Sequence, residues 1–335
     1  MKKNFAIIGC GHIANRHVKH IQAHHLGNVV GVFDIDSEKM KLFCEKYNIT
    51  GYGDFESLIN DDRVDVVNIC TPNGTHAELA IKSINAGKHT VVEKPMSISV
   101  STAREMQEAA RNSGVKLFIV KQNRYNPPVK TVKELMLEGK LNQPFMVSVN
   151  CFWNRNESYY NQSYWRGTKE LDGGTLYTQF SHFVDILYYL FGEIEDVKGT
   201  VDNMTHNDLI EFEDSGSFIF KFKNGGIGNL NFTTSSYEQN MEGSISIFSD
   251  NATIKIGGKY LNTIDYQITN GFDIVDIPTS SSANNYGFYE GSMSNHDKVI
   301  DNVIETLNGR QEIMTNSEEG VKVIEMIAQF YDAAK

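Results

Sequence analysis

Two short motifs carry residue types suited to redox chemistry. Gly9–Ala14 (Gly-Cys-Gly-His-Ile-Ala) separates an apolar run from a helical pattern, and Glu93–Pro95 (Glu-Lys-Pro) follows the short predicted strand His89–Val92. In an open α/β sheet, ligands bind beyond the carboxyl ends of the strands. A glycine-rich turn and a lysine that share this edge predict hydride transfer at a bound dinucleotide, with an amine beside the reacting carbon.

The glycine-rich turn has the features of a dinucleotide site. Gly9 permits a tight turn, Gly11 lets backbone approach a pyrophosphate, and Ala14 allows the helix to pack closely on the strand. Asp34 ends the next apolar run, where an acid can accept hydrogen bonds from the adenosine ribose 2′-hydroxyl and repel a 2′-phosphate. The turn therefore predicts NAD rather than NADP, and the alternative is a tight turn without a ligand.

Lys94 can serve the oxidation of a secondary alcohol in two ways. A desolvated lysine whose pKa is lowered can take the hydroxyl proton as a base. As a cation, it would instead stabilise the developing alkoxide. The sequence leaves both roles open, and the alternative is an exposed lysine before a turn. Strand alternation turns Glu93 to the opposite face, so Glu93 is assigned to the cofactor or to the structure.

The elements that must position these motifs change in character along the chain. Residues 4–120 alternate short β-branched runs with amphipathic helical patterns, which predicts a parallel sheet with helices on both faces. From residue 145 onward most runs alternate with a period of two, which is typical of an antiparallel sheet with one polar face. One helix interrupts them at about 175–190, and two more close the chain near 296–307 and 317–334. We therefore expect an α/β protein with a Rossmann domain at 1–122 and an α+β domain at 123–335, whose last helices can pack back on the first domain.

Composition and residue spacing limit the classes of partner and the cellular compartment expected for this chain. The formal net charge of −11 argues against nucleic acid, because phosphate binding needs clustered Lys and Arg. No apolar run approaches the length that crosses a bilayer, and no signal peptide precedes the first strand, so the chain is expected to be cytoplasmic. The four cysteines lie far apart, which favours reduced core residues. His17, His20 and His24 fall at helical spacing and are interpreted as a solvated face rather than a metal site.

Further motifs complete a pattern of a known family. In chain order they are Gly9-x-Gly11-x-x-Ala14, Asp34, Thr71-Pro72-Asn73-x-x-His76, Glu93-Lys94-Pro95 and Gly173-Gly174 followed by His182-x-x-Asp185. With these motifs the chain resembles the glucose–fructose oxidoreductase/inositol dehydrogenase (Gfo/Idh/MocA) family over nearly its whole length. The resemblance implies a Rossmann domain, then an α+β domain whose open sheet often mediates assembly into a homo-oligomer, here a dimer or tetramer. It also implies a cis peptide before Pro95.

One branch of that family is more similar than the others. Segments 121–127, 164–167, 240–244 and 255–262 look like those of the UDP-N-acetyl-2-amino-2-deoxyglucuronate dehydrogenases. Enzymes of this branch oxidise C3 of a UDP-linked N-acetylglucosaminuronic acid for surface-polysaccharide biosynthesis. The resemblance implies the same nucleotide-sugar substrate here, with NAD as the cofactor.

The resemblance also assigns the site. The implied cofactor contacts are Gly9, Gly11, His12, Ile13, Asp34, Thr71, Asn73, His76, Glu93, Lys94, Gln122, Trp165 and Arg166. The implied substrate contacts are Lys94, Asn123, Arg124, Tyr125, Thr178, Gln179 and His182. Lys94 and His182 are the catalytic candidates, and no metal is expected.

Several of these assignments have structural alternatives. Many inositol-type members carry Asp one helical turn before the histidine, where this chain has Thr178, so an inositol-type histidine–carboxylate relay is in doubt. Asp185 is placed to orient His182 on one helix, or is an exposed helix acid. Arg124, Arg166 and Trp165 suit a diphosphate, a carboxylate and a ring, or else an ion pair and a core tryptophan. The rival functions are a dehydrogenase of a free sugar or inositol, and a non-catalytic NAD-sensing regulator.

Overall fold

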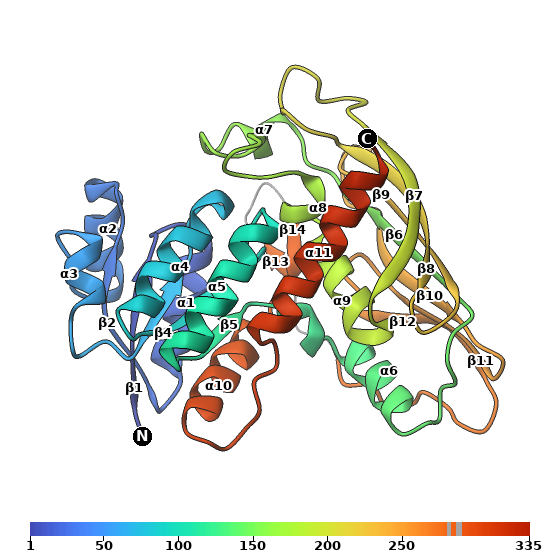
Figure 1. The fold of residues 1–335 in the computed structure, drawn as a ribbon, viewed down its shortest axis with the longest axis horizontal. Coiled ribbons are helices and arrows are strands. Elements are labelled where there is room, and N and C mark those ends of the chain that lie inside the picture. Colours follow the sequence, from blue (N-terminus) through green and yellow to red (C-terminus); the bar gives the residue numbers. More distant parts are fainter. Residues whose placement is uncertain (280–282, 286–289) are drawn as a thin grey trace. The chain divides into compact units, whose positions relative to one another are not determined.

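The computed structural model describes residues 1–279, 283–285 and 290–335. Its contacts divide the chain into two compact units. The first unit comprises residues 1–121 and 296–324, and the second comprises 122–295 and 325–335. Helix α11 (Ser317–Ala333) begins in the first unit and ends in the second (Figure 1). No helix among the described residues combines the length and the apolar character needed to cross a membrane.

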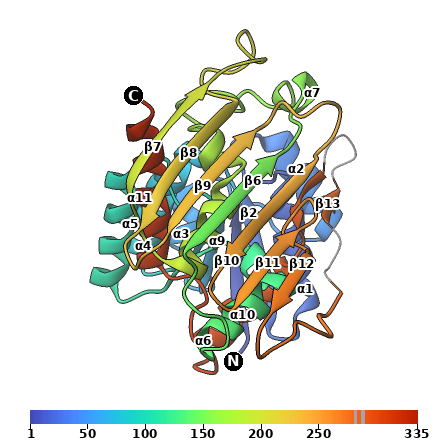
Figure 2. The same ribbon diagram turned by 90° about the vertical axis from the view of Figure 1, so that its right-hand side faces the viewer.

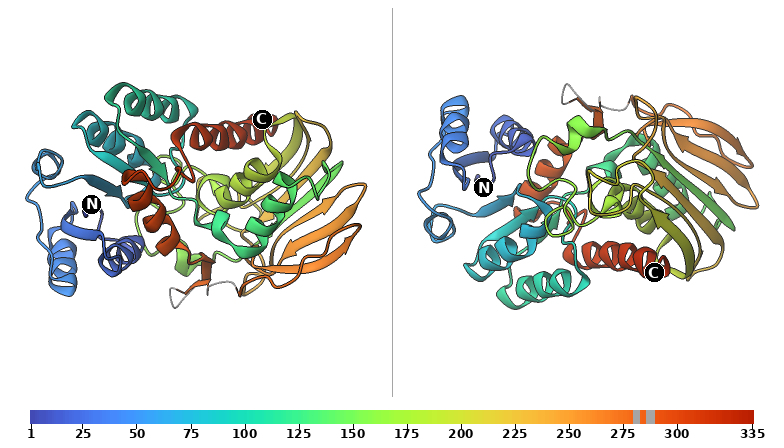
Figure 3. Two further views of the ribbon diagram at one scale, coloured as in Figure 1. Left: turned by 90° about the horizontal axis from the view of Figure 1, so that it is seen from below. Right: turned by 90° about the horizontal axis from the view of Figure 1, so that it is seen from above.

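A parallel five-stranded sheet, ordered β2-β1-β3-β4-β5, forms the centre of the first unit. Its strands are β1 (Lys3–Ile8), β2 (Gly27–Phe33), β3 (Val66–Ile69), β4 (His89–Val92) and β5 (Leu117–Ile119). Its helices are α1 (His12–Ala23), α2 (Ser37–Tyr47), α3 (Phe55–Ile59), the 3₁₀ turn η1 (Asn73–Thr75), α4 (His76–Asn85), α5 (Val100–Ser113) and α10 (His296–Leu307). Helices lie on both faces of the sheet (Figure 3), which confirms the predicted Rossmann architecture.

The strands of this sheet are apolar along their length because both faces are covered. Phe5, Ala6 and Ile7 of β1 are fully buried, as are Val66 and Val67 of β3. Burying one large apolar side chain contributes about 1.5–3 kcal/mol, so a continuous apolar run is stable only between two helical layers. Such a core holds the strand ends, and the turns that follow them, in fixed places.

A seven-stranded sheet, ordered β12-β11-β10-β6-β9-β8-β7, forms the second unit (Figure 2). All its strand pairs are antiparallel except β6–β9, which confirms the predicted mainly antiparallel sheet. The strands are β6 (Met146–Phe152), β7 (Ile194–Asp202), β8 (Ser215–Phe222), β9 (Ile227–Thr233), β10 (Glu242–Phe248), β11 (Ala252–Gly257) and β12 (Thr263–Thr269). The other elements are η2 (Gln122–Tyr125), α6 (Pro127–Leu137), α7 (Glu157–Tyr160), α8 (Thr175–Thr178), α9 (Ser181–Phe191) and the short pair β13 (Ala283–Asn285) and β14 (Glu290–Met293).

Aromatic side chains fill the covered face of this sheet. The ring of Phe218 lies 5.0 Å from that of Phe330 at the end of α11, and Phe222 lies 5.6 Å from Phe191 of α9. Trp153 lies 5.3 Å from Phe180 and is 2% exposed. The two-residue alternation of β8 therefore directs its phenylalanines inward and exposes Ser217, Ile219 and Lys221 on the outer face.

The helix predicted at 175–190 is two helices, α8 and α9 (Figure 1). The amide of Phe180 donates to the carbonyl of Thr175, five residues back, whereas that of Phe183 donates to Phe180, three residues back. This change of hydrogen-bond register breaks the helix at Gln179 and Phe180. As a result, Thr178 and His182 do not stand one turn apart on one regular helix.

Candidate active site

The glycine-rich turn lies at the carboxyl edge of the parallel sheet. Gly9 has φ of +89°, and a Cβ there would lie 2.6 Å from the carbonyl oxygen of Cys70, so only glycine fits. A Cβ on Gly11 would meet nothing within 4 Å, and Gly11 is the N-cap of α1. Open space at exposed amides of a helix N-terminus is what a pyrophosphate requires, so the turn fits NAD. His12 and Ile13 form the first turn of that helix.

Asp34 follows β2, and its side chain contacts the glycine-rich turn. Its Oδ2 accepts a hydrogen bond from the amide of Cys10 at 2.6 Å, and its Oδ1 accepts from the amide of Asp36 at 2.9 Å. The Nζ of Lys39 lies 3.6 Å from Oδ2. The carboxylate is thus held beside the turn at the place where the ribose of a dinucleotide needs an acceptor.

His76 joins two of the predicted motifs. Its Nδ1 lies 2.8 Å from the carbonyl oxygen of Pro95, and its Nε2 lies 3.0 Å from the carbonyl oxygen of Thr71. The ring is fully buried, and burial lowers the pKa of His76. His76 therefore ties the turn after β3 to the segment after β4. Asn73 is buried in the same turn, and the hydroxyl of Thr71 accepts from that of Thr75 at 2.8 Å.

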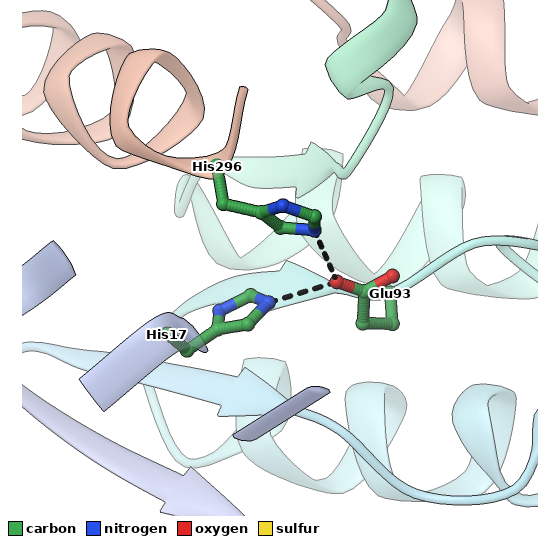
Figure 4. A group of neighbouring side chains, drawn as sticks. All are labelled: His17, Glu93 and His296. Carbon is green, nitrogen blue, oxygen red and sulfur yellow. Dashed lines mark hydrogen bonds and ion pairs between the residues drawn. The ribbon is translucent and has the colours of Figure 1, made fainter. Parts of the chain in front are cut away.

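Glu93 and Lys94 leave the end of β4 in different environments. Glu93 is buried, and its Oε1 lies 2.8 Å from Nε2 of His17 and 3.5 Å from Nε2 of His296 (Figure 4). Lys94 is half-buried, and the Lys94–Pro95 peptide is cis, as the family resemblance implies. Burial alone would raise the pKa of Glu93, but hydrogen bonds and charge from His17 and His296 hold it well below its usual range.

His17 corrects the prediction of a solvated histidine face on the first helix. His17 is fully buried, and His24, which is half-buried, lies 3.4 Å from the carboxylate of Asp301 in α10. The periodic pattern showed the shared helix face but gave no sign that α10 packs against it. The interpretation of His17 as part of a solvated face is therefore wrong, and both His17 and His24 have an acidic partner.

The donor set of His17, Glu93 and His296 resembles that of a divalent-metal site, since the three ligand atoms all lie within 4.8 Å of one another. Ligand atoms around a tetrahedral zinc stand about 3.3 Å apart, given Zn–N and Zn–O bonds of about 2.0–2.2 Å. The His17–Glu93 separation of 2.8 Å is instead that of a charge-assisted hydrogen bond. The geometry favours a hydrogen-bonded network over a metal site.

His182 in the second unit belongs to a buried polar chain. The Nε2 of Gln122 donates to the hydroxyl of Ser292 at 2.9 Å, and that hydroxyl lies 3.3 Å from Nε2 of His182. Because the serine oxygen already accepts a hydrogen bond from Gln122, the serine hydroxyl can donate its own hydrogen to Nε2 of His182. All three side chains are buried. This chain of contacts fixes the ring of His182.

Arg124 and Asp185 form a buried ion pair. The Nε and Nη2 of Arg124 donate to Oδ2 and Oδ1 of Asp185 at 3.0 and 2.8 Å. Each residue is 1% exposed, so the interpretation of Asp185 as an exposed helix acid is wrong. The fork of Arg124, predicted to bind substrate, is directed at this carboxylate and joins η2 to α9.

Three other predicted residues gather around Tyr159. The guanidinium of Arg166 lies over the Tyr159 ring at 4.2 Å, donates to its hydroxyl, and lies 4.9 Å from the ring of Trp165. The Nε2 of Gln179 donates to the same hydroxyl at 2.6 Å. The break between α8 and α9 thus places Gln179 next to the Trp165–Arg166 segment.

The remaining predicted substrate residues lie in buried or half-buried positions. The hydroxyl of Thr178 hydrogen-bonds to the carboxylate and the carbonyl oxygen of Asp172, so an acid does lie beside this position. The side-chain amide of Asn123 is buried, and neither its oxygen nor its nitrogen has a hydrogen-bond partner among the described residues. Tyr125 is half-buried.

The sequence reasoning did not find Tyr159, Asp172, Ser292 or His296. None of these residues lies in a motif. The partners of Ser292 and His296 are remote in sequence, and no regular helix or strand spacing links Tyr159 or Asp172 to its partner. A cluster of aromatic residues at 159–165 was the one available signal for Tyr159.

Comparison with known proteins agrees with this geometry. The family model described as "Oxidoreductase family, NAD-binding Rossmann fold" matches residues 3–121, and that described as "Oxidoreductase family, C-terminal alpha/beta domain" matches residues 133–335. The crystal structure of the WlbA dehydrogenase from Chromobacterium violaceum in complex with NADH and UDP-GlcNAcA is 33% identical, with a TM-score of 0.89 over 99% of this chain and 94% of that one.

Two further relatives cover nearly the whole chain. The WlbA dehydrogenase from Bordetella pertussis, in complex with the same two ligands, is 31% identical, with a TM-score of 0.87 over 100% of this chain and 97% of that one. Glucose-6-phosphate 3-dehydrogenase of Bacillus subtilis is 24% identical over 98% of this chain and 96% of its own length. The chain belongs to the Gfo/Idh/MocA family of oxidoreductases and carries that family's NAD-binding Rossmann domain.

Proposed function

We propose that this protein is an NAD-dependent dehydrogenase that oxidises the C3 hydroxyl of a UDP-linked 2-acetamido-2-deoxyglucuronate. The observation that carries the proposal is the similarity, at 33% and 31% identity over 99–100% of this chain, to two dehydrogenases whose crystal structures hold NADH and UDP-GlcNAcA. The Glu93–Pro95 motif at the edge that carries the dinucleotide turn supports it.

The cofactor and the residues of the chain have separate roles in the proposed reaction. NAD, when bound, supplies the hydride acceptor. The amine of Lys94 takes the hydroxyl proton if it is neutral, or stabilises the alkoxide if it is charged. The imidazole of His182 is the second group that holds or moves this proton, with its ring oriented by Ser292 and Gln122.

The second unit offers polar groups for the sugar. Asn123 keeps both amide atoms buried without a hydrogen-bond partner among the described residues. A buried amide left unsatisfied costs free energy, so a ligand that bonds both atoms gains that energy on binding. We assign Asn123 to the hydroxyl or N-acetyl groups of the substrate, with Tyr125 and Gln179 as further contacts.

The direct test compares substrates and one substitution. NADH formation is measured with UDP-GlcNAcA, UDP-GlcNAc, glucose 6-phosphate and inositols, each with NAD and with NADP. We expect turnover with UDP-GlcNAcA and NAD. Lys94→Met should lower kcat by about 100-fold or more, since a positioned acid or base contributes about 10²–10⁴-fold.

Lys82→Met is the matched control, because Lys82 is exposed on α4 and pairs with Glu78. It should keep wild-type turnover. Undiminished turnover in Lys94→Met would refute the catalytic assignment. Turnover with an inositol or glucose 6-phosphate but not with the nucleotide sugar would refute the proposed substrate.

A free sugar or its phosphate is the second candidate substrate. It is favoured by the near-complete overlap with glucose-6-phosphate 3-dehydrogenase. The presence of Lys94 speaks against the third candidate, a non-catalytic NAD-sensing regulator, since sensing needs no amine beside the cofactor.

We also propose that the chain forms a homo-oligomer through the outer face of the seven-stranded sheet. Ile219 and Ile227 are 62% and 53% exposed on the neighbouring strands β8 and β9. Apolar side chains on a broad, open sheet face favour burial against a second copy.

A further inference from the structure

Glu93 lies at the junction of three elements of the first unit. It follows β4, and its carboxylate oxygen Oε1 faces His17 of α1 at 2.8 Å and His296 of α10 at 3.5 Å (Figure 4). The two rings approach edge to face, with centroids 5.8 Å apart. All three side chains are buried, so water does not screen their interaction.

The second oxygen of this carboxylate reaches the backbone of Lys94. Oε2 accepts a hydrogen bond from the Lys94 amide at 3.2 Å. Both carboxylate oxygens are therefore engaged by protein groups. The carboxylate is held by two helices on one side and holds the peptide from which Lys94 projects on the other.

The surroundings of His17 suit a protonated ring. Its Nε2 donates to Glu93, and its Nδ1 lies 2.8 Å from the side-chain amide of Asn68. The amide oxygen of Asn68 is buried and has no hydrogen-bond partner among the described residues. Rotating that amide lets its oxygen accept from a protonated Nδ1, so the imidazolium can have an acceptor at each nitrogen.

The same network reaches the dinucleotide turn. His17 belongs to α1, whose N-cap is Gly11. His17 and the N-terminal amides of α1 therefore belong to one regular helix. The Glu93 carboxylate thus connects the helix that would receive the pyrophosphate with the backbone of the candidate catalytic lysine.

We propose that Glu93 is a positioning residue: an ionised carboxylate, bound by His17 and His296, that fixes the backbone of Lys94 relative to α1 and makes no contact with the cofactor. This inference rests on the proposed role of Lys94 in proton transfer. It replaces the assignment of Glu93 to the cofactor with a role inside the protein. It also predicts that His17 carries a proton at neutral pH.

The test is the Glu93→Gln variant, which keeps the shape and removes the charge. Its kcat and KM are measured with NAD and UDP-GlcNAcA, its dissociation constant for NADH by fluorescence, and its fold by circular dichroism. We expect kcat to fall by about 100-fold, since a small misplacement of a reacting group has an effect of that size. The dissociation constant for NADH should stay within about threefold of wild type, because the hydrogen bonds of the dinucleotide turn are unchanged.

Glu78→Gln is the matched control, since Glu78 is an exposed acid on α4, and it should leave every value unchanged. A tenfold weaker affinity for NADH with unchanged kcat would show that Glu93 is a cofactor ligand and would overturn the proposal. Unchanged kcat and affinity would overturn it as well. So would one equivalent of divalent metal in the purified protein whose removal abolishes turnover.

Two further measurements keep the proposal testable if Glu93→Gln does not fold or if no substrate is turned over. His296→Gln removes the more distant partner of the carboxylate and should lower kcat less than Glu93→Gln, with NADH affinity retained. The ¹⁵N spectrum of histidine-labelled wild-type protein, in which His17 is assigned by its loss in His17→Gln, reports protonation without any substrate. A neutral His17 at pH 7 would contradict the network even if UDP-GlcNAcA proves to be the substrate, and a charged His17 would support it even if it does not.

Discussion

The buried histidine at the centre of the first unit should make its stability depend on pH. Burial alone would lower the pKa of His17, but Cys70 after β3 and Glu93 after β4 raise it from 6.5 to about 10. His296 of α10 faces the same carboxylate, and burial lowers the pKa of His296. Because the pKa of His17 is higher in the folded state, its contribution is complete below pH 6.5 and is lost as the pH rises towards 10.

We therefore expect the free energy of unfolding of the first unit to fall between pH 7 and 9.5, by up to about 1.4 kcal/mol per pH unit from this proton. Tryptophan fluorescence would report on the second unit, because both tryptophans lie there. Unfolding of the first unit is therefore measured by hydrogen exchange of the β1 and β4 amides. The decline should be shallower in His17→Gln and unchanged in His25→Gln, whose side chain is exposed. An equally steep decline in His17→Gln would show that other groups cause it.

Single residues were predictable where a local motif defines them. The glycine-rich turn and Asp34 could be located because their roles need particular residue types at fixed spacing in a strand–turn–helix. His17 could not be interpreted in this way, since its partner His296 lies far along the chain and only the packing of α10 on α1 brings them together. The ion pair of Asp185 could not be predicted for the same reason, because helical spacing does not reveal an arginine in another element.

The packing of η2 against α9 should depend strongly on the buried ion pair between Arg124 and Asp185. Asp185→Asn leaves the guanidinium of Arg124 without its charged partner in a buried place, and we expect a loss of about 3–5 kcal/mol in the free energy of unfolding. The double variant Arg124→Met/Asp185→Leu should lose less, because it leaves no charge buried. Urea unfolding followed by tryptophan fluorescence measures both, since Trp153 and Trp165 report on the second unit.

An exposed pair in the same unit provides the control. Asp196 and Lys221 are joined across β7 and β8 at 2.8 Å in solvent, so Asp196→Asn should leave unfolding nearly unchanged. If Asp185→Asn instead unfolds like wild type and raises the KM for the nucleotide sugar, Arg124 is a substrate ligand and the structural interpretation fails.

Helices and strands were predicted well where hydrophobic periodicity is regular. They were predicted poorly where hydrogen bonds determine the point at which a helix ends. The strands of the parallel sheet followed from continuous apolar runs, and β8 from its alternating phenylalanines. The break between α8 and α9 did not follow, because Leu176, Phe180 and Phe183 keep a helical apolar pattern through it. The change of register depends on backbone hydrogen bonds and on the side-chain contacts of Gln179, which periodicity does not describe.

The division into two units depends on contacts that are remote in sequence. Residues 296–324 return to the first unit, where α10 packs on α1 and Asp301 pairs with His24. Helix α11 then carries the chain back, and Phe330 packs on the sheet of the second unit. A continuous helical pattern such as 317–334 gives the helix but not the point at which it passes from one unit to the other.

The outer face of the seven-stranded sheet offers the last test, which concerns the assembly of the whole protein. Its side chains alternate with those that fill the core, so Ile219, Ile227 and Ile268 of β8, β9 and β12 are directed to solvent. A stable interface between two copies buries about 1,200–2,000 Å² in total, and a broad open sheet can supply such an area. A charge placed within that area would be buried without a partner on association.

We therefore expect Ile219→Lys to shift the protein from an oligomer to a monomer in size-exclusion chromatography with light scattering. Ile35→Lys is the matched control, since Ile35 is 83% exposed but lies in the first unit, and it should leave the mass unchanged. The affinity for NADH should be unchanged in Ile219→Lys, because the dinucleotide turn belongs to the first unit and Ile219 to the second. A wild-type protein that is monomeric at micromolar concentration, or an Ile219→Lys variant that keeps the wild-type mass, would exclude this face as the interface. In either of these cases the exposed isoleucines would require another explanation. A monomeric Ile219→Lys variant that still binds NADH would show that cofactor binding does not depend on assembly.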